Sequence, residues 1–171
     1  MVLISIISLT ISICSLAVTF YYNKKNYRVQ VTNKPKIDDL NTVRLLVLDF
    51  ISNMDTAIYY CFRAYENSLD SKKDGIDFTD SDKKIQNVEN SLNRLETFLH
   101  FENDGELRED IKNTAVYART DKLSSCFSES TNGIKIFIEE TKYQRKYNAE
   151  KEKLLNDLDD FYQNKLEQLL H

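Results

Sequence analysis

The sequence contains little glycine and proline, with three glycines and one proline in 171 residues. Both residues interrupt regular secondary structure and supply the tight turns that connect short strands. Their scarcity favours long uninterrupted helices over a β-sheet protein. Tryptophan is absent, but 42% of the residues are hydrophobic and 29% are charged. A chain of this composition can bury a core, so we do not expect it to be disordered.

The groups that carry most enzyme chemistry are also scarce. Three cysteines and two histidines do not form the clusters that a zinc site requires, and a disulfide framework would need more cysteines. We interpret Cys61 and Cys126 as reduced, buried thiols. The sequence has no G-x-S-x-G motif, no glycine-rich phosphate loop and no Glu-x-x-His pair. We therefore expect no metal, no cofactor-binding site and no evident catalytic activity.

Two further classes of ligand are disfavoured by charge. The net charge is −4, and no run of lysine and arginine is long enough to follow a phosphate backbone, so nucleic acid is not an expected partner. The acidic segment 70–82 has the look of a calcium loop. With Gly75 at the sixth position of an EF-hand, however, Lys72 and Ser81 fall where an oxygen ligand and a glutamate belong. We interpret this segment as a solvated turn.

The long hydrophobic run is at the start of the chain. Residues 1–22 contain no charged side chain, and about twenty helical residues cross a hydrocarbon core of roughly 30 Å. A cleaved signal peptide is disfavoured because no basic residue precedes the run. A lipoprotein signal is disfavoured because Ile13, not a small residue, precedes Cys14. We predict that residues 1–22 are a transmembrane anchor.

Basic residues follow this run directly. Lys24, Lys25 and Arg28 form a membrane flank, and the positive-inside rule places the C-terminal side of the anchor in the cytoplasm and the N-terminus outside. Residues 23–37 are predicted to be a basic juxtamembrane stalk, whose helix continues from the membrane and breaks near Pro35. Membrane lipid is therefore an expected partner of the N-terminal helix.

Residues 38–171 carry helical periodicity and are predicted to be one cytoplasmic helical domain. The strongest pattern starts after Asp38 and Asp39 and has apolar residues at steps of three or four. Its members are Leu40, Val43, Val47, Phe50, Met54, Ile58, Cys61 and Tyr65. A second helix is expected after the capping residues 79–81, with a stripe made of Ile85, Val88, Leu92, Leu95 and Leu99.

Two more helices are predicted, at about 106–128 and from 134 to the end of the chain. Residues 134–138 alternate isoleucine with other residues in a strand-like way, but a single strand without a partner is unstable, so we favour helix. The fold prediction is thus all-α: an N-terminal transmembrane helix followed by a four-helix up-down bundle with long first and last helices. The overhanging ends of these two helices suit a coiled coil, with each other or with a second copy.

One pair of residues has a spacing found in an enzyme family. Arg94 is followed six positions later by His100. This spacing resembles the motif of HEPN ribonucleases, which are small helical bundles. The resemblance implies that Arg94 holds a scissile phosphate and that His100 handles a proton. In the alternative interpretation, neither residue is catalytic: Arg94 is an exposed residue and His100 lies at a helix end.

The leading hypothesis from the sequence is a membrane-tethered protein-interaction module at the cytoplasmic face, which binds itself or another protein through the helical bundle. The layout resembles that of small single-pass proteins of phages and mobile elements, some with defence or exclusion roles. The alternatives are a membrane-anchored HEPN-like ribonuclease and a pore-forming or defence effector. The span has hydroxyl groups but no charge to line a channel, which counts against a pore.

Overall fold

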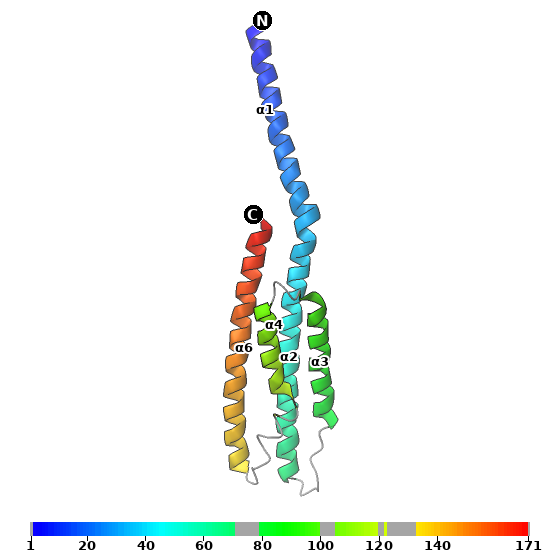
Figure 1. The fold of residues 1–171 in the computed structure, drawn as a ribbon, viewed down its shortest axis with the longest axis vertical. Helices are drawn as coiled ribbons and strands as arrows, with labels where there is room; N and C mark the ends of the chain where they lie inside the picture. The colour runs from blue at the N-terminus through cyan, green and yellow to red at the C-terminus, as the bar shows by residue number, and fades with distance from the viewer. Residues whose placement is uncertain (1, 71–78, 100–104, 120–121, 123–132, 171) are drawn as a thin grey trace.

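The computed structural model describes residues 2–70, 79–99, 105–119, 122 and 133–170. Within these ranges the secondary structure is helical and contains no strand, so the all-α prediction is confirmed. Residues 134–138 belong to a helix, which decides between the two interpretations of their alternating pattern. Figure 1 shows the helices lying roughly along one long axis, with the N-terminal helix extending beyond the others.

Three elements join end to end in one long helical rod. These are α1 (Val2–Tyr27), the π-helix η1 (Arg28–Asn33) and α2 (Lys34–Asp70). The Lys34 N–H donates to the carbonyl of Val29, five residues earlier, which is the wide hydrogen bond of a π-helix. This wide turn directly precedes Pro35, which has no N–H to donate and whose ring crowds the preceding turn of a regular helix. Pro35 therefore lies in the first turn of α2, directly after a π-helix, and the helix continues where the sequence had predicted a break.

The core stripe of α2 is confirmed. All eight residues of the predicted stripe are buried. Leu46, Ile51, Ala57 and Phe62 widen it to about half of the helix surface. Against it pack α3 (Thr79–Phe98), which begins at the predicted cap, and part of α6 (Gly133–Leu170). The long α2 and α6, of 37 and 38 residues, confirm that the first and last helices of the domain exceed the middle ones.

The third helix is shorter than predicted. It comprises α4 (Gly105–Ala115) and a 3-10 turn, η2 (Val116–Ala118), after which Arg119 is extended. The carbonyl of Tyr117 accepts a hydrogen bond from the Tyr143 hydroxyl of α6, a contact that an α-helix continuing past this point would compete for. The predicted later residues of this stripe, Leu123 and Phe127, and also Cys126, lie outside the described residues.

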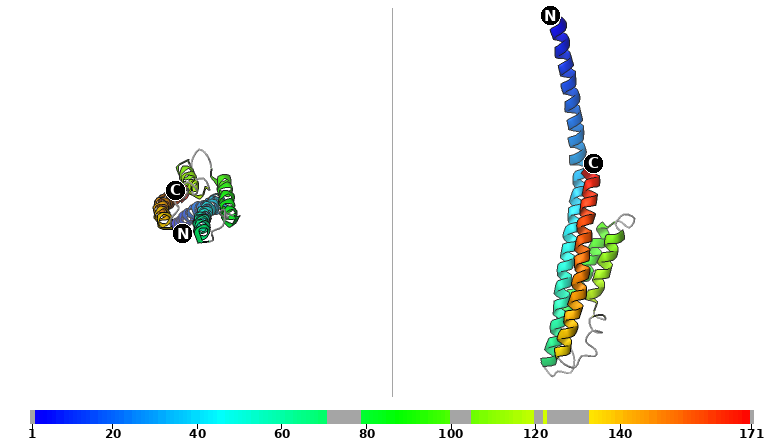
Figure 2. Two further views of the ribbon diagram at one scale, coloured as in Figure 1. Left: turned by 90° about the horizontal axis from the view of Figure 1, so that it is seen from below. Right: turned by 90° about the vertical axis from the view of Figure 1, so that its left-hand side faces the viewer.

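The C-terminal end of α6 returns to the junction between α1 and α2, as the right-hand view of Figure 2 shows. There the Asn33 side-chain amide donates to the carbonyl of Leu169. Further along the pair, the Tyr162 hydroxyl donates to the Asn41 side chain at 2.8 Å. The overhanging end of α6 thus packs along η1 and the start of α2.

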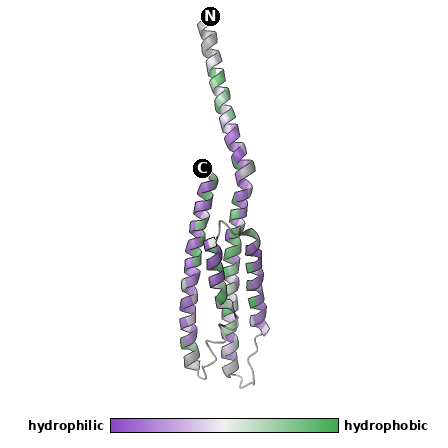
Figure 3. Ribbon diagram, in the orientation of Figure 1, coloured by the Kyte–Doolittle hydropathy of each residue, from purple (hydrophilic) through white to green (hydrophobic). Residues whose placement is uncertain are grey.

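One helix in the described part of the chain is long and apolar enough to cross a membrane, judged by length and composition. It is the continuous helix that contains Thr10–Asn67 and begins near the N-terminus, and half of its most apolar stretch is buried within the protein. Figure 3 shows hydrophobic colours along the middle of α1 and hydrophilic colours at its junction with α2. Every side chain from residue 10 to residue 27 is exposed. This helix is a candidate membrane span.

Candidate functional site

The outward side of α2 carries an uncharged stripe that faces away from the core. We call it the outer stripe, and it consists of Leu45, Leu48, Ser52, Thr56 and Tyr59. Its members follow one another at steps of three, four, four and three, so they share one helix face. Leu45 is 67% exposed, Leu48 43% and Tyr59 53%, although they belong to the same helix as fully buried residues. The outer stripe is therefore a surface that the described helices leave uncovered.

The edge of the outer stripe toward α6 is held by polar contacts. Arg44 pairs with Asp159 at 3.3 Å, and its guanidinium lies 5.1 Å from the centre of the Tyr162 ring. About three turns further along α2, Asp55 accepts hydrogen bonds from the Tyr147 hydroxyl at 2.8 Å and from the Lys151 ammonium at 3.0 Å. The charges on this edge are therefore engaged with α6.

The edge toward α3 is held in a similar way. The Asn53 amide donates to the Ser91 hydroxyl at 2.7 Å, and that hydroxyl donates to the carboxylate of Asp49 at 3.2 Å. Arg94 adds an exposed ion pair to Asp49 at 3.8 Å. Because the charged residues on both edges point their groups toward α3 or α6, no charged side chain lies on the outer stripe between residues 45 and 59.

Behind the outer stripe, an aromatic cluster fixes α6 against the rest of the domain. Tyr147 is buried, and its ring contacts that of Tyr117, with 6.0 Å between centres. Tyr143 contacts both Tyr117 and Phe62 edge-on, at 5.5 and 5.7 Å. Burial raises the pKa of the Tyr147 hydroxyl above its usual value, and donation to Asp55 raises it further. This hydroxyl is therefore a structural donor that stays protonated.

An open groove of about 1130 Å³ lies between α4 and the C-terminal half of α6. Its lining includes two lysines and five carboxylates: Lys153, Lys165, Glu106, Glu109, Asp110, Asp157 and Asp160. Lys153 bridges the almost buried Asp110 at 2.5 Å and Asp157 at 3.9 Å. A hydrogen bond with Asp110 raises the pKa of Asp157, with desolvation as a further cause. Lys153 therefore compensates the inner carboxylates of the groove, whereas the proximity of Asp110 to Asp157 favours the protonated form of Asp157.

The described residues contain no group of three or more histidine, cysteine or acidic side chains placed to hold a metal ion. The exposed Cys14 and the buried Cys61 are free thiols. Burial raises the pKa of Cys61 from 9.0 to about 11; its hydrogen bond to Ser81 opposes this shift, and Asp82 adds to it. A thiol with this pKa is a poor nucleophile at neutral pH.

The structure places Arg94 and the three basic flank residues on the surface of the protein. Arg94 is on the surface of α3, where it pairs with Asp49. His100 lies outside the described residues, so the structure does not place it relative to Arg94. Lys24 and Lys25 are exposed in the last turn of α1, and Arg28 is exposed at the start of η1. The three flank residues therefore share the lower end of the apolar helix.

The outer stripe was not predicted from the sequence. Leu45 and Leu48 were outside the strong core periodicity, and the signal that identifies them is a second run of uncharged residues on the opposite face of the same helix. Comparisons with protein-family models, with curated proteins and with solved structures found no match to this chain.

Proposed function

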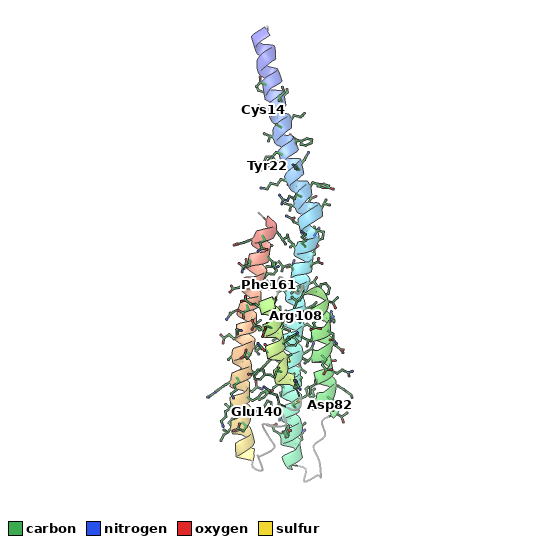
Figure 4. All side chains as sticks on the ribbon, viewed as in Figure 1. Cys14, Tyr22, Asp82, Arg108, Glu140 and Phe161 are labelled. Carbon is green, nitrogen blue, oxygen red and sulfur yellow. The ribbon has the colours of Figure 1, made fainter. Side chains whose placement is uncertain are left out.

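We propose that this protein is a membrane-tethered helical interaction module, with α1 as a single-pass anchor and the following helices as a domain at the cytoplasmic face. The observation that carries the proposal is the exposure of the apolar side chains of α1. Leu16 and Phe20 are each 73% exposed, and Cys14 and Tyr22 stand on a helix that projects alone in Figure 4. A helix that is apolar all round is stable in lipid, where it satisfies its own backbone groups, and is unfavourable in water.

The proposed orientation is supported by the basic flank. Lys24, Lys25 and Arg28 are exposed on the domain side of the apolar segment. Cytoplasmic flanks carry an excess of lysine and arginine, so this flank favours a cytoplasmic domain. The exposed tyrosines Tyr21 and Tyr22 lie at the same end, where aromatic side chains favour the boundary between lipid and water.

We further infer that α2, α3, α4 and α6 form an up-and-down bundle. In support, α2 packs on α3 and α6, and α4 packs on α6. The colour order in Figure 1 reverses direction from each of these helices to the next. A bundle of this kind offers helix faces to a partner more readily than deep clefts. The exposed outer stripe of α2 is the face that supports an interaction role.

The tether is tested by membrane flotation and alkaline carbonate extraction of the full chain. A double variant, Ile13→Arg with Leu16→Arg, places two charges near the centre of the span, and each costs about 2.5–3.5 kcal/mol of apparent insertion free energy. We expect the wild type to stay in the membrane fraction and this variant to leave it. The matched control, Ile13→Ala with Leu16→Ala, keeps an uncharged span and should stay. Extraction of the wild type by carbonate would contradict the tether.

Location and partner are then tested on the anchored protein. A C-terminal tag should resist protease added outside intact cells and become accessible after lysis. Cross-linking in mild detergent, followed by identification of the recovered chains, should give a defined complex with the wild type. The Ile13→Arg, Leu16→Arg variant should lose that complex if the anchor sets where the module binds. Tag digestion in intact cells would contradict the cytoplasmic orientation.

A further inference from the structure

We propose that the outer stripe of α2 is a parallel self-pairing face, on which a second copy of this chain docks through the same five residues. The inference rests on the proposed membrane tether and deepens it by naming the partner and the contact surface. The partner copy would present Leu45 to Leu45, Ser52 to Ser52 and Tyr59 to Tyr59 about a twofold axis along the helix.

Charge favours a copy of the same chain over a foreign partner. In a parallel symmetric helix pair, each residue on the axis meets its own counterpart, so any charge there meets a like charge. The five residues of the outer stripe are all uncharged, in a chain that is 29% charged. Its charged neighbours Asp49 and Asp55 are bound to α3 and α6. Charge returns to this face at Arg63, which pairs with Glu66, donates a hydrogen bond to the Tyr59 hydroxyl at 3.1 Å and lies over the Tyr59 ring.

The tether supplies the orientation. Because α1, η1 and α2 form one continuous helical rod, two copies inserted in one membrane hold their α2 helices parallel and at the same depth. Like residues of the two outer stripes are then at the same height above the membrane. An antiparallel arrangement, which would place Leu45 against Tyr59, is excluded by two anchors that enter the same leaflet from the same side.

The size of the stripe makes the pairing depend on the membrane. Fifteen residues of one helix face cover roughly 20 Å by 10 Å, on the order of 200 Å². A stable complex in solution buries about 800 Å² on each partner. The outer stripe is too small to hold a soluble dimer by itself, whereas confinement of two anchors raises the effective concentration without new contacts. We therefore expect dimers only of the inserted protein.

The test is disulfide cross-linking of the full chain in membranes. Ser52→Cys places a thiol at the centre of the stripe, and Asn90→Cys places one on the exposed face of α3 as the matched control. Both are made with Cys14→Ser and Cys126→Ser, while the buried Cys61 is kept. Under mild oxidant we expect at least tenfold more linked dimer from Ser52→Cys than from Asn90→Cys.

Charge variants test the contact itself. Leu45→Glu in the Ser52→Cys chain should lower linked dimer to the level of Asn90→Cys, because two carboxylates then face each other. Gln86→Glu, which adds the same charge on exposed α3, should leave it unchanged. The Ser52→Cys against Asn90→Cys comparison needs no destabilising substitution, so it decides the proposal even if Leu45→Glu misfolds.

The outcomes distinguish a failure of the self-pairing face from a failure of the membrane tether. Equal cross-linking at the two cysteines in a protein that floats with membranes would overturn the self-pairing face and leave the tether intact. A wild-type chain that fails to float would overturn both. Capture of a foreign protein at Ser52, with no dimer of this chain, would also overturn the proposal.

Discussion

The apolar residues at the two ends of the long helical rod have opposite exposure. In α1 the apolar residues surround the helix and are all exposed from residue 10 onward, whereas in α2 they gather on one face and are buried. The difference is the angular distribution of apolar residues, since both segments are helical and contain many isoleucine and leucine residues. An apolar stripe with a period of 3.6 indicates protein neighbours, and an apolar surface all round indicates lipid. On the proposed tether, the α1 part of this rod lies in lipid and the α2 part in the protein core, with the basic flank between them.

The largest difference between α1 and α2 is expected for the stability effect of replacing a phenylalanine in each. Phe50 is fully buried in α2, and Phe20 is 73% exposed in α1. Phe50→Ala removes core contacts and leaves a cavity, so we expect a loss of about 3–5 kcal/mol in the free energy of unfolding. Phe20→Ala should change that free energy by less than about 0.5 kcal/mol, since surface substitutions have small effects. Chemical unfolding of the full chain in mild detergent, followed by circular dichroism, measures both. Equal losses would mean that α1 belongs to the folded core.

The reactivity of one cysteine in each segment, Cys14 in α1 and Cys61 in α2, tests the same difference. Cys61 is protected by the protein, and its pKa of about 11, two units above 9.0, lowers its thiolate fraction about 100-fold. In a chain with Cys126→Ser, we expect a water-soluble maleimide at pH 8 to label Cys61 at least 100-fold more slowly than a cysteine placed at Asn90. Unfolding should remove this protection.

Cys14 should differ, because on the proposed tether lipid and not protein shields it. We expect no labelling of Cys14 in membranes and rapid labelling in the Ile13→Arg, Leu16→Arg variant, which does not insert. Cys61 should stay protected in the same variant. Rapid labelling of Cys14 in intact membranes, or of Cys61 in the folded variant, would contradict the assignment of two different environments.

A smaller effect is expected at Tyr147, a buried residue of α6. Tyr147→Phe keeps the buried ring and removes the hydrogen bond to Asp55, which leaves the carboxylate with Lys151 alone. We expect a loss of about 1–3 kcal/mol at pH 7. Unfolding in urea, compared between the wild type and the variant, measures this loss. No change at pH 7 would mean that water replaces the hydroxyl without cost.

The same substitution tests a pH dependence. Because burial and Asp55 raise the pKa of Tyr147, the unfolded chain loses this proton near pH 10 while the folded chain keeps it. The stabilising contribution is therefore present below pH 10 and is lost as the pH rises above 10. The fall in stability between pH 9 and 11 should be steeper in the wild type than in Tyr147→Phe. Parallel falls in the two chains would contradict the raised pKa.

Several features of the fold could be predicted from the sequence because they depend on local periodicity. The stripe from Leu40 to Tyr65 has the helical period over seven turns, and every predicted member is buried. The capping residues near Thr79 likewise set the start of α3. The end of α4 could not be predicted, because the hydrogen bond that accompanies it comes from Tyr143, which is 26 residues away from Tyr117. A tertiary contact of this kind leaves no periodic signal in the sequence.

The candidate site was less predictable than the fold. Leu45 and Leu48 have ordinary helical spacing, and only the positions of α3 and α6 show that they stay uncovered. The π-helix was also unexpected, since proline in sequence predicts an end or kink and does not specify a widened turn. The proposed pairing of Arg94 with His100 stays a prediction, because His100 lies outside the described residues.

The smallest predicted effect lies at the junction of the two regions. Asn33→Ala removes the side-chain donor that binds the Leu169 carbonyl at the end of α6. A neutral hydrogen bond contributes about 0.5–1.5 kcal/mol, and this one is only half-buried, so the global stability should change little. The last turn of α6, however, should open more often, with amide hydrogen exchange there about three- to tenfold faster. Hydrogen exchange followed by mass spectrometry measures that turn directly.

The control for this junction is Thr42→Ala. The Thr42 hydroxyl bonds to the carbonyl of Asp38 within its own helix, so its removal should not change exchange at the end of α6. Faster exchange in Asn33→Ala alone would show that the Asn33 side chain, just beyond the basic flank, holds the C-terminal end of α6 in place. Equal exchange in the two variants would mean that apolar packing along α2 positions α6 without the Asn33 contact. In that case α1 and the helical domain are joined only through the backbone of η1. On the proposed tether, the anchor would then orient α2 without holding the end of α6.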